Sequence, residues 1–67
     1  MHLYLIVGYD PENQQWLCFL LFALSRQSAK DEIKAHCGVM GVDLQKIQSH
    51  DVTLKEGEIQ RIDTLVP

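Results

Sequence analysis

Two apolar runs of strand length dominate the first third of the chain, at residues 3–9 and 16–24. The first run is rich in β-branched and aromatic side chains, which is typical of a β-strand, and it is too short for a stable helix. A turn signal separates the two runs, because Pro11 presets φ for the second position of a turn and Asp10 can cap that turn through its carboxylate. The pattern therefore predicts a β-hairpin.

The second run differs from an ordinary surface strand because neither of its faces is polar. In a strand, the even-numbered residues of 16–24 point to one face and the odd-numbered residues to the other, and both sets are apolar. Both faces are then expected to be buried. A buried helix through Leu24 is the alternative, since periodicity does not settle a short apolar run. The aromatic content and the hairpin signal favour the strand.

An amphipathic helix is predicted over residues 26–37. Ala29, Ile33 and Cys37 recur at i, i+4 and i+8, so they form one apolar stripe along a helix, while the opposite side is charged. The stripe is expected to pack on one face of the sheet.

The ends of this helix carry their own signals. Ser25 is the expected N-cap residue, with Ser28 as an alternative one turn later. Asp31 and Glu32 are expected to favour the positive end of the helix dipole. Gly38 is expected to be the residue that ends the helix.

The last third of the chain has a weaker pattern. Residues 44–50 and 52–54 fit either one broken strand or two, and Gly57 is expected to supply a positive φ in a turn. Residues 58–66 fit a strand or a helix, and the turn before them favours the strand. The predicted fold is a single small α+β domain over residues 1–67, with a small antiparallel sheet in β-β-α-β-β order and one amphipathic helix packed on one face.

One helix covers only one face of such a sheet, and few residues remain to build a second layer. Self-association is the economical way to bury the second face, so a C2 homodimer is expected. The residues assigned to this association face are Leu17, Phe19 and Leu21.

The charge pattern excludes two classes of partner. Six Lys and Arg stand against nine Asp and Glu, a formal net charge of −3, and the basic residues are dispersed. Without a basic stripe we expect no direct nucleic-acid binding and no membrane contact. The N-terminus lacks a signal-peptide n-region, and the longest apolar run has about half the length of a membrane-spanning helix. Two cysteines make no disulfide framework, so a cytoplasmic protein with reduced thiols is expected.

The side chains suited to metal binding or nucleophilic catalysis form no recognised motif. No pair has C-x-x-C or H-x-x-x-H spacing, and the adjacent His36 and Cys37 would point about 100° apart on a helix. A Cys37–His50 pair would need a cleft and an oxyanion hole. We therefore expect no metal, no cofactor and no enzymatic activity. The side chains considered are His2, Cys18, His36, Cys37 and His50.

Acidic and aromatic residues near the predicted turns are the candidates for binding a partner. Carboxylates at turns can form an acidic surface for a basic protein, and Tyr and Trp are favoured at interfaces. The alternative for Tyr9 and Trp16, which flank the hairpin loop, is a cross-strand pair that clamps the hairpin. The candidate partner-binding residues are Tyr9, Asp10, Glu12, Trp16, Glu56 and Glu58.

The hairpin followed by residues 22–29 resembles the layout of small proteins of phages and mobile elements. The resemblance covers less than half of the chain and includes no catalytic or ligand motif, so it assigns no functional residue. The leading hypothesis is a non-enzymatic protein–protein interaction module, an adaptor or an inhibitor, that is homodimeric. The alternatives are a phage or mobile-element inhibitor of a host machine, a purely structural subunit, and a minimal ligand-binding or enzymatic dimer with its site at the subunit junction.

Overall fold

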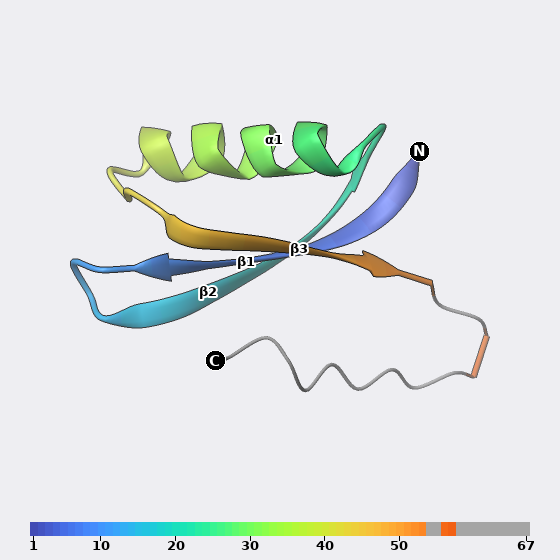
Figure 1. Ribbon diagram of the computed structural model, residues 1–67, viewed down its shortest axis with the longest axis horizontal. Helices are drawn as coiled ribbons and strands as arrows, with labels where there is room; N and C mark the ends of the chain where they lie inside the picture. Colours follow the sequence, from blue (N-terminus) through green and yellow to red (C-terminus); the bar gives the residue numbers. More distant parts are fainter. Residues whose placement is uncertain (54–55, 58–67) are drawn as a thin grey trace.

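The computed structural model describes residues 1–53 and 56–57, and within them the chain forms a three-stranded sheet with one helix on one side (Figure 1). The sheet is antiparallel throughout, with β1 in the centre and the strand order β2-β1-β3. This confirms the α+β class and the hairpin. The elements are β1 (His2–Asp10), β2 (Gln15–Ala23), α1 (Arg26–Val39) and β3 (Gln45–Val52).

The two pairings of β1 differ in regularity. β1 pairs with β2 without interruption from His2↔Ala23 to Asp10↔Gln15. The pairing with β3 shifts register between Val7 and Tyr9, as at a β-bulge. The outer strand β2 is therefore regular along its whole length, whereas the outer strand β3 is irregular near Tyr9 of β1.

The core lies between the sheet and α1. Every second residue of β1 points toward the helix, and Ile6 at the centre has no exposed surface. The predicted stripe of α1 packs against these strands, as expected from its spacing. The buried residues of this core are Tyr4, Ile6, Ala23, Ala29, Ile33, Cys37 and Leu44.

Ser25 is the N-cap of α1, as predicted. Its backbone is extended, and its Oγ accepts a hydrogen bond of 3.1 Å from the backbone N–H of Ser28. The first turn carries no acidic residue, so the expected dipole contribution of Asp31 and Glu32 is wrong. Because the helix starts at Arg26, both carboxylates lie too far along it to act on its N-terminus.

The helix ends later than predicted. Gly38 lies within α1, and Gly41 takes the positive φ of 78° that follows the C-cap. The N–H of Val42 donates to the carbonyl of Cys37 at 2.8 Å, and the N–H of Gly41 donates to that of Gly38 at 3.1 Å. This is the bonding of a Schellman motif, which satisfies the last carbonyls of a helix. Gly41, and not Gly38, therefore ends the helix.

After the helix, the described residues hold one strand. β3 runs through residues 45–52 without the predicted break, and Gly57 has the expected positive φ of 75°. The strand predicted over 58–66 lies outside the described residues, so the β-β-α-β-β order is not confirmed.

Gly8 is required by close packing. A Cβ at this position would overlap the side chain of Leu44, which is buried over the β1 backbone. We predict that Gly8→Ala lowers the free energy of unfolding by about 1–3 kcal/mol, the usual cost of overpacking a core. Denaturant unfolding monitored by circular dichroism measures this change.

Gly38→Ala is the matched control. No atom lies within 4 Å of a Cβ at Gly38, which sits in the helix. This variant should gain up to about 1 kcal/mol, because Ala favours a helix interior over Gly. Equal effects of the two substitutions would contradict the packing argument.

Candidate functional site on the outer strand β2

The odd-numbered residues of β2 point toward α1. Leu17, Phe19 and Leu21 are half-buried and pack against the core beneath the helix. The ring of Phe19 makes an edge contact with the ring of His36 on α1, with 6.2 Å between the ring centroids. The sequence assigned these three residues to the face away from the helix. That assignment is corrected by the packing, because they belong to the helix side.

The opposite side of β2 carries an exposed apolar surface. Leu20 and Phe22 are 61% and 64% exposed, and Cys18 between them and the hairpin is also exposed. Their partners on β1, Leu5 for Leu20 and Leu3 for Phe22, lie on the same side of the sheet, where Leu5 is buried and Leu3 is half-buried. Among residues 1–53 and 56–57, no helix or strand covers this side. We call Cys18, Leu20 and Phe22 the β2 patch.

The outer edge of β2 is also unprotected. No strand of the described residues pairs with it, and its nine residues include neither a charge nor a proline. Exposed edges of this kind tend to pair with another chain, and charges, prolines and bulges usually prevent it. The other edge strand, β3, has such protection, because it carries Lys46 and Asp51 and pairs across the register shift.

Tyr9 and Trp16 form the cross-strand pair that was the alternative to partner binding. They are directly opposite in the register, and their ring centroids lie 5.2 Å apart with a tilt of 57°. The Nζ of Lys46 lies 5.6 Å from the centroid of Tyr9. Contacts of this type stabilise a hairpin. Both aromatic side chains stay half-buried at the loop end of the sheet.

Asp10 organises the hairpin loop and is only 1% exposed. Its Oδ2 accepts a hydrogen bond of 2.8 Å from the Asn13 side chain, and its Oδ1 accepts one of 3.2 Å from the backbone N–H of Glu12. The Asn13 bond is the main reason why the pKa of Asp10 lies below its ordinary value, while burial acts in the opposite direction. Asp10 is therefore a buried turn residue and leaves little carboxylate surface for a partner.

The remaining acidic candidates are not brought together. Glu12 is exposed on the hairpin loop, and Glu56 is exposed in the turn at residues 56–57. Figure 1 shows this turn, in orange, at the end of the molecule opposite the hairpin loop. Glu58 lies outside the described residues. The described acidic candidates therefore do not form a single acidic surface.

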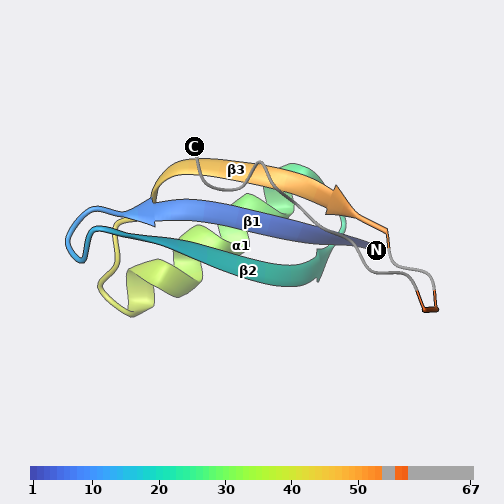
Figure 2. The same cartoon turned by 90° about the horizontal axis from the view of Figure 1, so that it is seen from below.

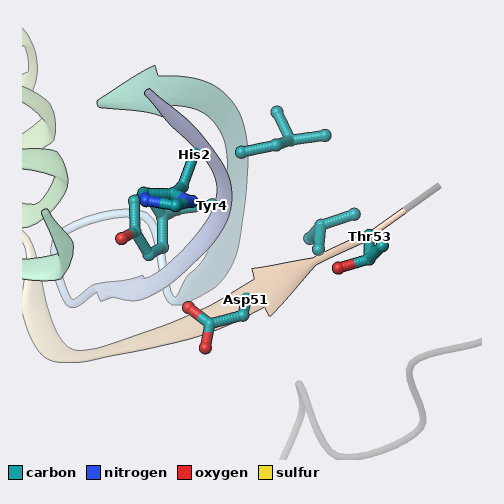
Figure 3. Close-up of a pocket in the computed structure, with 6 residues that line it drawn as sticks. His2, Tyr4, Asp51 and Thr53 are labelled. Atoms are coloured by element: carbon teal, nitrogen blue, oxygen red, sulfur yellow. The ribbon is translucent and has the colours of Figure 1, made fainter. Parts of the chain in front are cut away.

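An open hollow of about 340 Å³ lies where the start of β1 meets the end of β3. Figure 3 shows the His2 and Tyr4 side chains together on β1, with Asp51 on the neighbouring strand. The carboxylate of Asp51 is engaged, because its Oδ2 lies 2.9 Å from Nη2 of Arg26 in an exposed ion pair. The hollow contains no cysteine or serine among its described lining residues, which are His2, Leu3, Tyr4, Asp51, Val52 and Thr53.

The Cys37 thiol and the His50 imidazole lie on opposite sides of the sheet. Burial between α1 and the sheet raises the pKa of the Cys37 thiol, and the charge of Asp10 acts in the same direction. His50 pairs with Leu5 on the side away from α1, and its Nε2 is buried without a hydrogen-bond partner in the described part of the chain. The Cys37–His50 pair considered from the sequence is thus not assembled. No three potential metal ligands gather within the described ranges.

Comparison with protein families, with curated proteins and with solved structures found no match to this chain. Over the part of the chain that is described, no helix combines the length and the apolar character needed to cross a membrane. Within the described residues, the β2 patch and the outer edge of β2 are prominent exposed features.

The hydrogen bonds that Asp10 accepts in the loop make the stability of the fold depend on pH. The deprotonated form of Asp10 accepts the loop hydrogen bonds, so its contribution to stability is present above the unfolded pKa of about 3.8 and is lost as pH falls through the lower folded pKa. We predict that Asp10→Asn lowers the melting temperature at pH 7 and that the difference from wild type shrinks at pH 2. Glu12→Gln, in the same loop, is the control and should change melting little at either pH. A difference for Asp10→Asn that is equal at both pH values would contradict this role.

Proposed function

We propose that this chain is a small non-enzymatic protein–protein interaction module that works as a homodimer, with the β2 patch as its contact surface. The observation that carries this proposal is the exposure of Leu20 and Phe22, at 61% and 64%, on the side of β2 that faces away from α1. Neighbouring exposed apolar side chains on one side of a strand are typical of an interaction site.

A second copy is the partner that the chemistry of the patch favours. The patch contains no charged side chain, so two copies that meet there bring no like charges together, although each chain carries a net charge of −3. A two-fold axis places the same surface on both sides of the contact, which an uncharged apolar surface tolerates well.

The small size of the domain also favours association. A chain of 67 residues buries a modest fraction of its surface, and an additional layer adds to its stability. Contact with the side chains of a second copy buries part of the exposed Leu20 surface, and a two-fold dimer contains this contact twice.

The charged surface stays outside this contact and is proposed to meet further partners. Glu12 on the hairpin loop is exposed, so a dimer with this contact presents two copies of an acidic loop to a protein with a basic surface. An adaptor or inhibitor would bind through such rim charges, and that binding would weaken with salt.

The first test is the solution mass of the chain over a dilution series, by light scattering. We predict a dimer for the wild type and a rise of at least about 100-fold in the dissociation constant for Leu20→Lys, because the lost burial and the added charge occur twice. Leu20 is largely exposed, so the variant should keep its fold, which far-UV circular dichroism checks.

Gln45→Lys is the matched control for this experiment. Gln45 is exposed on the other outer strand, so the substitution adds the same charge at the opposite edge of the sheet. It should leave the mass unchanged. A wild type that is monomeric throughout the series, or equal weakening by the two substitutions, would overturn the proposed dimer.

A further inference from the structure

We propose that the second copy adds its β2 to the outer edge of β2, antiparallel, so that the dimer contains one continuous six-stranded sheet. This inference rests on the proposed homodimer and specifies its geometry. The alternative geometry, in which two copies stack face to face through the patch, would leave both β2 edges unpaired.

The edge itself supports strand pairing. β2 is nine residues long and keeps an uninterrupted register with β1, so its outer backbone groups form a regular row. Strand addition satisfies such a row with main-chain hydrogen bonds, and no side-chain charge of β2 opposes it. A paired strand also brings apolar side chains to both sides of the new junction.

The position of α1 supports the same arrangement. Figure 2 shows the C-terminal half of the helix extending beyond the β2 edge of the sheet. A strand added at this edge would lie beneath that part of the helix, where it would cover the half-buried side chains of Leu17, Phe19 and Leu21. The three residues that the sequence assigned to self-association would then contact the partner from the helix side.

Symmetry and strand length define the register. Full overlap of two antiparallel copies of Gln15–Ala23 centres the two-fold axis on Phe19. Cys18 then lies opposite Leu20 of the second copy, and both belong to the β2 patch. Even-numbered residues pair with even-numbered ones, so the two helices lie on the same side of the enlarged sheet.

The arrangement closes at two copies. After β2 pairs with β2, the outer strands of the six-stranded sheet are the two copies of β3. Each carries Lys46, Asp51 and the register shift, which are the features that discourage further pairing. The edge asymmetry thus predicts a dimer and not a fibre.

Disulfide trapping tests this register. Leu20→Cys places a thiol opposite Cys18 of the second copy, where directly paired positions have Cα atoms about 4.5–5.5 Å apart, within the range of a disulfide. With oxidised glutathione as the oxidant, we expect most of the folded protein to migrate as a covalent dimer on a non-reducing gel and to return to monomer after reduction. The native thiols of Cys18 are diagonal in this register, about 7–8 Å apart, so the wild type should cross-link poorly.

Two control variants distinguish cross-links that need the proposed strand register from cross-links formed by random collision of two chains. Leu20→Cys combined with Cys18→Ser should lose the cross-link, because the remaining thiols at position 20 are diagonal. Gln45→Cys, on the exposed part of β3, should stay monomeric on the gel. Equal cross-linking by all three variants would overturn the strand pairing.

The experiment also distinguishes the two proposals. A dimer by light scattering, together with a Leu20→Cys variant that forms no cross-link, would overturn the strand pairing and leave the homodimer standing. A monomer by light scattering without a cross-link would overturn both, and the β2 edge would then have to serve a strand from a different protein.

Discussion

Burial of apolar side chains between α1 and the sheet is the interaction on which this fold depends. α1 has 14 residues, is roughly 21 Å long and packs on one side of the sheet. On the covered side, Ile6 of β1 and Ile33 of α1 are buried in one core. On the other side, Leu20 and Phe22 of β2 stay largely exposed. The proposed function follows from this difference, because β2 is apolar on both of its faces and α1 packs on one of them.

The strand order places two different edges on opposite sides of the sheet. Because β1 lies in the centre of the three described strands, β2 and β3 are the edge strands among them, yet only β3 carries charges and a register shift. The charged residues that discourage strand pairing thus lie on β3, and the uncharged residues that permit it lie on β2 at the opposite edge of the sheet. An interaction module with one open edge and one protected edge is suited to forming a closed pair.

Local signals in the sequence predicted much of the fold. The hairpin followed from two apolar runs around Pro11, and the cap followed from Ser25, because turn and cap chemistry depend on residues close in the chain. The end of the helix was misplaced because Gly38 and Gly41 both fit a C-terminal signal. The backbone conformation alone separates them, since Gly41 has the positive φ.

The orientation of β2 was beyond the reach of sequence patterns. Its odd-numbered and even-numbered residues are both apolar, so alternation cannot show which set faces the helix. Packing decides it, and Leu17, Phe19 and Leu21 lie beneath α1 while Leu20 and Phe22 do not. The role of Asp10 was predicted only in part. Its position in the turn was foreseen, but its burial by loop hydrogen bonds appears only when the loop is folded.

Residue-resolved amide hydrogen exchange is the most direct measurement of the central claim. It should be recorded at two protein concentrations, one below and one above the dissociation constant of the dimer. The account predicts that alternate amides of β2, those on its outer edge, become protected at the higher concentration, while the outer amides of β3 do not change. Exchange from β2 at the same rate at both concentrations would contradict the pairing of two copies along this strand.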